Sequence, residues 1–538
     1  MGTSGSFQVE PGSAEYDALK ARLKQQGSNI TAQGPRCSLR SRKMYSDSQP
    51  DYLRMTLLDK PGALAKIATC LGDAGISIDQ MRQINQPGEA DDNAVVIFVT
   101  HKAAPDDVAH AMTRAGAKVK VIEPAARVGG SIRTVREGGW VVETGPNTLQ
   151  LEGEGDETLL ATYGLAEATQ TADMRAAKRF IYAHGKLHGF GGNPLAILTS
   201  SLLSCSGKLR LLSEPFRTKG GPVGETVEGF ASRRFGPEAA AMLMDPVVNG
   251  VHAGDPSKLV MADCFPRIHA LEQEYGSVLR GLRRAPKVTR KVVGFPHGMQ
   301  QLADAMAATI GEGNVHLRSV ATQIRRDAKG WNVAWRNADG IEQGACAKHL
   351  IVTAPHWHWA SLPFDESVTR LLRDWENASV PAVTVVARGY ALADVPHPLD
   401  GFGYLTPGAE KRDVLGCLFP TSVLPARAPA GHALLCCFIG GARRPDLAAL
   451  SDEALSKIVD EELAGTLGIK AAPHKEWIQR WERAIPQYDV GQRRREDALT
   501  QAEAAHPGLH FHGAFRGGIA LMHVIRTGDA LGLALAKG

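Results

Sequence analysis

The chain opens with a polar stretch that has little hydrophobic patterning. Residues 1–49 are rich in Gly, Ser, Gln and basic side chains, with one short helical pattern at 16–26. This composition predicts a mostly disordered leader. A transit peptide is the alternative, but Glu10, Glu15 and Asp17 are atypical of such acid-poor peptides.

Regular hydrophobic periodicity begins in the next segment, residues 50–116. YLRMTLLD and ISIDQMRQI alternate as strands do, and PGALAKIATCLGDAG between them has apolar residues at helical spacing before it stops at glycine. NAVVIFVTH, APDDVAHAMTRAG and KVKVIEP then repeat the pattern of strand, helix and strand. This order predicts a ferredoxin-like α+β module, in which two helices cover one face of an antiparallel sheet.

The remaining residues, 117–538, have the pattern of a large α/β body. Helical runs dominate near 157–246, strands near 291–355, and both types follow to the end. A chain of 538 residues is too long for one hydrophobic core, so two or three domains are expected. We therefore predict a two-lobed body in which the chain crosses between the lobes more than once.

Composition and charge narrow the partners and the location. The chain has 61 basic and 57 acidic side chains, a net charge of +4, without a long block of one sign. This balance argues against a polynucleotide partner. Eight scattered cysteines without a CxxC pair, and the lack of an apolar secretion segment, predict a reduced, cytoplasmic protein. No stretch reaches the roughly 18 to 20 apolar residues of a membrane-spanning helix, and peripheral membrane contact is left open.

The stretch KVKVIEPAARVGGSIRTVREGGWVVETGPNTLQ carries the first chemical signal. A strand that ends in an acidic residue, here Glu123, is where dinucleotide folds hold the adenosine ribose. Alone this signal is weak, but Glu123 is followed by Arg127, Gly129, Gly130 and then by Glu143 with its glycine and proline. That run resembles the flavin amine-oxidase superfamily. A surface hairpin with glycine turns is the alternative.

Further stretches narrow the resemblance to protoporphyrinogen oxidases. LRLLSEPF, ETVEGFASRRFGPEAAAMLMDPVVNGVHAGDPSKL, KVVGFPHGMQQL, LDGFGYLTP, WERAIPQYDVG and HPGLHFHGAFRGGIALMHVIRTG are similar to that family in order and spacing. The resemblance implies an FAD-binding, two-lobed amine-oxidase-like fold of class α/β (α+β). It places the FAD part at about 117–160, 291–355 and 505–538, and the substrate part at about 161–290 and 356–504.

The resemblance also implies site residues, while the flavin itself would carry the redox step, so no catalytic side chain is expected. The implied cofactor contacts are Glu123, Gly129, Gly130, Ser131, Gly145, Pro146, Asn147, Thr148, Val320, Ala514, Ile519, Ala520 and Leu521. The implied substrate contacts are Arg179, Leu405, Leu418 and Phe438. A flat tetrapyrrole suits apolar walls, and its propionates suit a guanidinium. Without the family, Arg179 reads as a solvated charge and Phe438 as a core aromatic.

The segment DYLRMTLLDKPGALAKIATCLGDAGISIDQMRQI resembles the ACT domain of bacterial homoserine dehydrogenases. ACT modules bind amino acids where two copies pair, which implies a homodimer and an amino-acid ligand. The ligand turn would be Asp59, Lys60, Pro61 and Gly62. Ordinary turn chemistry explains Pro61 and Gly62 equally well.

One departure from the flavin family stands out. A GxGxxG turn is expected about two dozen residues before the ribose acid, but counting back from Glu123 gives THKAAP at 100–105, without a glycine. Both predicted modules also include KVKVIE as a strand. The ACT module requires antiparallel pairing of this strand, whereas a dinucleotide fold requires parallel pairing. A gene fusion or a joined reading frame would explain such a junction.

Three functional hypotheses follow. The leading one is an oxygen-dependent, FAD-containing protoporphyrinogen oxidase of haem biosynthesis, impaired by the missing glycines. The second is an amino-acid-binding regulatory protein with a non-catalytic oxidase body, and the third is another flavin desaturase of the superfamily. A metal site is not expected, because the pairs His356 with His358 and His510 with His512 lack matching ligands.

Overall fold

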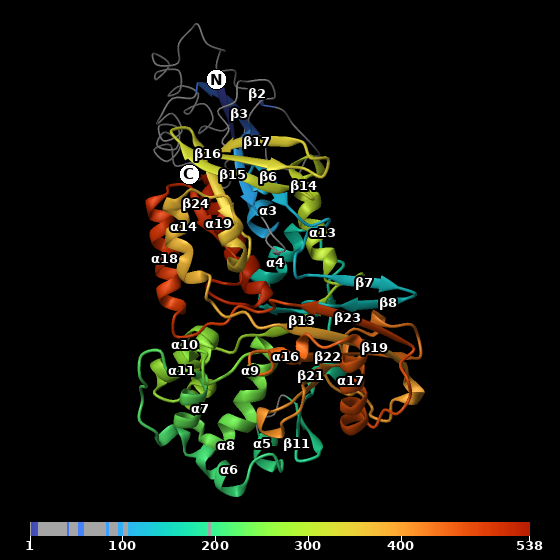
Figure 1. Ribbon diagram of the computed structural model, residues 1–538. Coiled ribbons are helices and arrows are strands. Elements are labelled where there is room, and N and C mark those ends of the chain that lie inside the picture. The colour runs from blue at the N-terminus through green and yellow to red at the C-terminus, as the bar shows by residue number, and fades with distance from the viewer. Residues whose placement is uncertain are drawn as a thin grey trace. The chain divides into compact units, whose positions relative to one another are not determined.

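The computed structural model describes residues 106–191 and 195–537 and, before them, five strands (Figure 1). Two compact units are present, Met1–Asp92 and Asn93–Gly538. The first contains a sheet in the order β2-β3-β1-β4. Its strands are β1 (Gly2–Gln8), β2 (Arg40–Ser41), β3 (Tyr52–Leu58) and β4 (Arg82–Ile84).

Two of these strands lie where the sequence predicts a mostly disordered leader. β1 pairs antiparallel with β3 along its whole length, and β2 pairs with the other edge of β3. The alternating strand β3 therefore receives backbone partners from residues 1–49, which composition alone does not indicate. The helix predicted at PGALAKIATCLGDAG and the proposed ligand turn at 59–62 lie outside the described residues.

The second unit is organised around a five-stranded parallel sheet in the order β14-β6-β5-β18-β24. Its pairings are all parallel. The strands are β5 (Val95–Val99), β6 (Lys118–Glu123), β14 (Val315–Leu317), β18 (His349–Val352) and β24 (Leu509–Phe511). This is the arrangement of a doubly wound nucleotide-binding sheet.

The segment that the sequence assigned to two modules belongs to this sheet. β5 pairs parallel with β6 and with β18, and helix α3 (Asp106–Arg114) joins β5 to β6. Of the two pairings left open for KVKVIE, the parallel one is therefore present. The compact unit begins at Asn93, whereas the sequence prediction divided the chain after residue 116. Residues 100–105 lie outside the described residues.

Helices α3, α13 and α19 cover this sheet. Val108, Ala109 and Met112 of α3 form a buried cluster with side chains of β6 and β18. Helix α19 approaches α3 closely at Gly532. A Cβ there would lie only 2.6 Å from the carbonyl oxygen of Val108, so the contact requires glycine. The helices in this part of the unit are α4 (Glu154–Thr162), α13 (Gln300–Ile310), α14 (Glu366–Leu372), α18 (Gln492–Ala505) and α19 (Leu521–Lys537).

A seven-stranded mixed sheet, in the order β12-β11-β20-β21-β22-β19-β23, forms the other part of this unit (Figure 1). Its strands are β11 (Arg179–Ala183), β12 (Lys186–Phe190), β19 (Val383–Ala391), β20 (Gly403–Leu405), β21 (Val414–Leu418), β22 (His432–Gly440) and β23 (Lys475–Trp481). Helices α15 (Pro420–Val423), α16 (Pro445–Ala448) and α17 (Asp452–Leu467) pack on it.

Smaller sheets and a helical region complete the unit. The small sheets contain β7 (Thr134–Glu137), β8 (Trp140–Glu143), β9 (Leu149–Glu152), β10 (Gln170–Thr171), β13 (Arg290–Gly294), β15 (Val320–Asp327), β16 (Gly330–Arg336) and β17 (Glu342–Ala347). The helical region contains α5 (Leu195–Thr199), α6 (Cys205–Leu212), α7 (Val227–Phe235), α8 (Pro237–Ala239), α9 (Asp245–His252), α10 (Met261–Cys264), α11 (Pro266–Tyr275) and α12 (Val278–Arg284). Among the described helices, none combines the length and hydropathy needed to cross a bilayer.

Candidate functional site

A cavity of about 1210 Å³ opens between the parallel sheet and the seven-stranded sheet. On one side it is lined by residues that directly follow parallel strands, including Ala125 after β6, Thr353 after β18 and Gly513 after β24. Ligands of doubly wound folds bind outside this carboxyl edge. The cavity therefore lies where the fold places a dinucleotide, and its volume suits a large ligand.

The glycine segment after β6 forms part of this wall. Gly129 and Gly130 have φ of 95° and 53°, in the left-handed region that favours glycine. The guanidinium of Arg127 donates to the carbonyl oxygens of Val128, Gly130 and Ile132, at 2.9, 2.5 and 2.7 Å. Burial lowers the pKa of Arg127, and Arg133 lowers it further. One partly buried side chain thus holds the turn in shape.

The segment after β8 lies directly against this turn. A Cβ at Gly145 would overlap the carbonyl oxygen of Ser131, so only glycine permits the two backbones to approach this closely. Upstream, the buried Glu143 accepts from Thr134 Oγ1 at 2.7 Å and from Met299 N–H at 2.8 Å. Burial raises the pKa of the Glu143 carboxyl, although nearby Arg427 opposes the shift.

The C-terminal segment closes the same side of the cavity. Gly513, Ala514 and Phe515 line it after β24, and Ile519 and Leu521 line it at the start of α19. The hydroxyl of Tyr488 donates to the carbonyl oxygen of Ala514 at 2.8 Å. This bond ties the C-terminal segment to the loop after β23.

The structure brings most predicted cofactor contacts together at this cavity. Those that line it are Gly130, Ser131, Gly145, Pro146, Asn147, Thr148, Ala514, Ile519 and Leu521. The others, Glu123, Gly129, Val320 and Ala520, are not among the lining residues.

The predicted residues outside the lining have identifiable surroundings. Glu123 is buried, and its Oε1 accepts from the N–H of Ala125, itself a lining residue, at 2.7 Å. Gly129 faces Ala303 and Gln300 of α13, since a Cβ there would lie 2.9 and 3.2 Å from their side chains. Val320, at the start of β15, is 56% exposed.

The opposite wall of the cavity is apolar. Val383 and Val385 of β19 line it together with Phe402, Leu418 and Phe438. Leu418 and Phe438 were predicted from the sequence as substrate contacts, and the structure places both on this wall. Such a wall suits a flat, hydrophobic ligand.

The two other predicted substrate residues lie behind this wall. Arg179, at the start of β11, holds its guanidinium carbon 5.2 Å from the ring centre of Phe402. Its side chain keeps contact with solvent, yet desolvation by the surrounding protein lowers the pKa of its guanidinium. Within the described part of the chain, Arg179 has no salt bridge. Leu405 of β20 packs against Gly250, which lines the cavity.

The sequence prediction missed several lining residues. Among them are Trp357 with His358, and the continuous segment Gln479–Pro486 that ends β23 and follows it. This segment overlaps WERAIPQYDVG, a stretch used only for the family resemblance. Trp481 Nε1 donates to the carbonyl oxygen of Thr144 at 2.6 Å, which joins this segment to the glycine-rich wall.

The charges and backbone of the cavity fit FAD. Four arginines line it, Arg127, Arg133, Arg480 and Arg483, against a single carboxylate, Glu482, among the described residues. This positive excess suits a diphosphate or carboxylates. Glycine segments allow close backbone approach to a cofactor. No cluster of His, Cys, Asp or Glu in the described chain could hold a metal ion.

Comparison with known proteins agrees with this geometry. The model of the family described as flavin containing amine oxidoreductase matches residues 108–524, and that of the ACT domain matches 52–117. A mitochondrial protoporphyrinogen oxidase of Nicotiana tabacum is 30% identical over 77% of this chain and 89% of its own length. A coproporphyrinogen III oxidase of Bacillus subtilis is 26% identical, over 77% and 90%.

The fold is shared with solved structures. Cyclohexylamine oxidase from Brevibacterium oxydans superposes with a TM-score of 0.60 at 17% identity, covering 83% of this chain and 99% of that one. The matched family supports FAD as the cofactor and an oxidoreductase as the class of enzyme. Because the family model matches most of this chain, the chain belongs to the flavin containing amine oxidoreductases.

Proposed function

We propose that this oxidoreductase uses FAD to convert protoporphyrinogen IX to protoporphyrin IX, with oxygen as the final electron acceptor. The observation that carries the proposal is the two-sided cavity, with a glycine-rich wall at the parallel sheet and an apolar wall on the seven-stranded sheet. Relatives named protoporphyrinogen oxidase, at about 30% identity over most of the chain, support the same substrate class.

When bound, FAD supplies a ring system that accepts hydride from the substrate. The chain's own residues do the binding and orienting. Val385, Leu418 and Phe438 offer a flat apolar face against which the macrocycle packs, and they keep water from it. Arg179, beyond Phe402, supplies a guanidinium suited to a propionate.

The direct test is an assay of the purified protein with two substrates. Near-stoichiometric flavin absorbance, together with oxygen-dependent appearance of porphyrin fluorescence from protoporphyrinogen, supports the proposal. Coproporphyrinogen carries more carboxylates, and faster turnover of it would place the chain with the Bacillus subtilis relative instead. A flavin-loaded protein that oxidises neither substrate would contradict the proposal and favour another flavin desaturase.

An amino-acid-binding regulatory protein is the second candidate, favoured by the ACT match at 52–117. In that case the oxidase body would be non-catalytic, which the missing glycines at 100–105 would explain. Colourless protein whose melting temperature rises with threonine or a similar amino acid would support this candidate. Yellow, active protein without such a shift would exclude it.

A contact with lipid is the remaining part of the proposed function. Leu209 and Leu212 of α6 and Phe216 after it are spaced for one helical face and are 69%, 49% and 85% exposed. Leu282 of α12 is 60% exposed. The segment 278–291 has six basic residues and no acidic one, so this surface pairs apolar with cationic groups. That combination fits an anionic lipid surface.

The two parts of this surface are joined through a buried carboxylate. Glu214 accepts from the N–H groups of Val278 and Leu279, at 3.0 and 3.1 Å, which fixes α12 beside the segment that follows α6. Vesicles of anionic phospholipid should co-sediment the wild-type protein but not a Leu212→Ser, Phe216→Ser variant. Ile341→Ser, at a site 58% exposed elsewhere, is the matched control. Equal sedimentation of all three proteins would contradict the lipid contact.

A further inference from the structure

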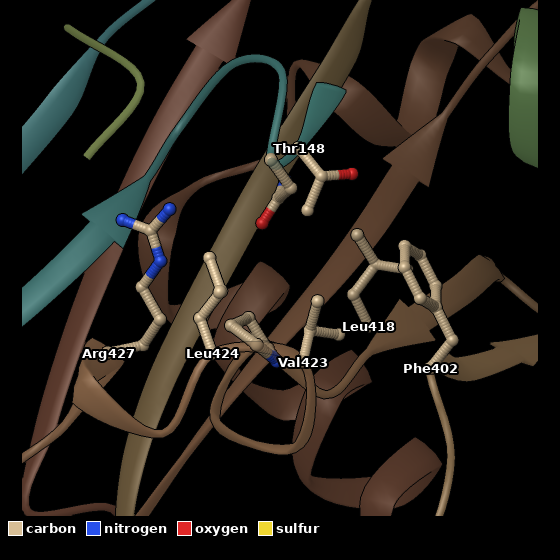
Figure 2. Close-up of a pocket in the computed structure, with 8 residues that line it drawn as sticks. Thr148, Phe402, Leu418, Val423, Leu424 and Arg427 are labelled. Carbon is tan, nitrogen blue, oxygen red and sulfur yellow. The ribbon is translucent and has the colours of Figure 1, made fainter. Parts of the chain in front are cut away.

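A second, much smaller pocket lies behind the apolar wall (Figure 2). Its volume is about 10 Å³. In Figure 2, Arg427 and Leu424 lie on one side of it, Phe402 and Leu418 on the other, and Thr148 above. Four of its lining residues also line the large cavity, namely Asn147, Thr148, Phe402 and Leu418. Only one layer of side chains therefore separates this pocket from the cavity.

The donor in this pocket is Arg427. Its side chain is 3% exposed, at the end of the short helical turn η10 (Pro425–Arg427). Its Nη1 lies 2.7 Å from Glu143 Oε1, which pairs the charges. That ion pair engages Nη1, whereas Nη2, which is also buried, has no hydrogen-bond acceptor among the described residues. Buried guanidinium N–H groups without an acceptor are costly, so a partner is expected.

The acceptor in the same pocket is Asn147. Its buried Oδ1 accepts no hydrogen bond from the described part of the chain, while its Nδ2 donates to the carbonyl oxygen of Gly145 at 3.2 Å. An unmatched donor and an unmatched acceptor therefore line one void. A void that offers about 10 to 15 Å³ to the centre of a water molecule holds one water, which here needs polar partners of both kinds.

We propose that this pocket is a structural water site, in which one water accepts from Arg427 and donates to Asn147 Oδ1. Arg427, from the substrate part, then acts as a positioning residue for Asn147, on the cofactor side of the cavity. Its effect on the cofactor rests on the proposed function, because Asn147 touches FAD only if FAD occupies the cavity. The water site itself does not depend on that proposal.

A double-mutant cycle tests the water link through FAD affinity of the apoprotein, measured by flavin fluorescence. Arg427→Met and Asn147→Ala should each weaken FAD binding about tenfold, equivalent to about 1.4 kcal/mol. Both substitutions break the same water bridge. The double variant should therefore bind FAD with the same affinity as the single variant that binds it less tightly. Arg427→Lys keeps a donor and should recover part of the loss. Additive losses, or no rescue by lysine, would overturn the proposal.

Arg388→Met is the matched control. Arg388 is also an almost fully buried arginine of the same part, paired with Asp460 and Glu476 on a face away from the cavity. The Arg388→Met variant should have a lower melting temperature than the wild type and an unchanged affinity for FAD. A high-resolution crystal structure of the wild-type protein gives a readout that needs no cofactor. Water density between Arg427 and Asn147 supports the site, and a pocket closed by side chains contradicts it even if FAD binds.

Discussion

The two walls of the large cavity differ in the share of backbone and side chains in their construction. The wall at the parallel sheet, called here the backbone wall, is built on segments in which glycine lets two loops touch backbone to backbone. The wall on the seven-stranded sheet is made of side chains, with Val385 and Phe438 projecting from neighbouring strands. A backbone wall cannot absorb an added methyl group by changing a rotamer, whereas a side-chain wall can repack. The first should therefore fix one cofactor, and the second should adjust to substrates.

The largest expected effect comes from the segment 100–105, where the family resemblance expects a glycine-rich turn. This segment has no glycine, and each charge-assisted hydrogen bond to a phosphate contributes about 1.5 to 3 kcal/mol. Replacing THKAAP with a glycine-rich turn should add two or three such bonds, about 3 to 9 kcal/mol in all. FAD should then bind roughly 10² to 10⁶ times more tightly, as measured by titration of the apoprotein. An unchanged dissociation constant would show that the missing glycines do not limit binding.

A smaller loss should follow from one methyl group on the same wall. Gly145→Ala places a Cβ against the carbonyl oxygen of Ser131, where only backbone movement relieves the overlap. We expect a cost of about 3 kcal/mol, seen as flavin lost during purification. Gly155→Ala is the matched control, because a Cβ there meets nothing within 4 Å. Equal flavin content in the two variants would contradict the idea of a rigid backbone wall.

The sequence predicted the elements of the backbone wall better than their pairing. NAVVIFV and KVKVIE were expected as strands and form β5 and β6. Their parallel pairing was left open, because alternation identifies a strand but not its neighbours. β5 lies between β6 and β18 in the sheet. The residues of β18 are more than two hundred positions away in the sequence, and their hydrogen bonds with β5 favour the parallel arrangement.

On the side-chain wall, the sequence predicted only the residues that the family resemblance implied. Leu418 and Phe438 were expected at the site, but Gln479–Pro486 was not, because a strand pattern does not tell which end faces a cavity. Arg427 was also missed. An arginine between alanines predicts a solvated charge, and only the tertiary position of Glu143 explains its burial.

The side-chain wall can be tested at Arg179, which lies behind it. Arg179→Ala removes a guanidinium suited to a propionate, at a cost of about 2 kcal/mol, so kcat/KM for the porphyrinogen should fall roughly 30-fold. Flavin content should not change, because Arg179 lies on the side-chain wall's far side. Arg175→Ala is the control, since that exposed arginine pairs with Asp173 instead. Parallel loss of flavin and activity would remove Arg179 from the substrate contacts.

The smallest expected effect concerns a histidine behind the backbone wall. His356 is buried among Trp357, Trp359, Trp375 and Phe515, and burial lowers its pKa from 6.5 to about 3. Between these values the unfolded chain binds a proton that the folded chain does not, so stability is full above pH 6.5 and falls as the pH drops. At pH 5.8 this one group should cost about 1 kcal/mol.

His356→Phe isolates that contribution, because a phenyl ring suits the aromatic surroundings and cannot be protonated. The variant should lose about 1 kcal/mol less unfolding free energy than the wild type when the pH falls from 8 to 5.8, as measured by denaturant titration at both values. The exposed His297, changed to Gln, should leave the acid loss as it is. If His356→Phe and wild type lose equal stability, the acid sensitivity lies elsewhere, and the aromatic packing behind the backbone wall tolerates a charged imidazole.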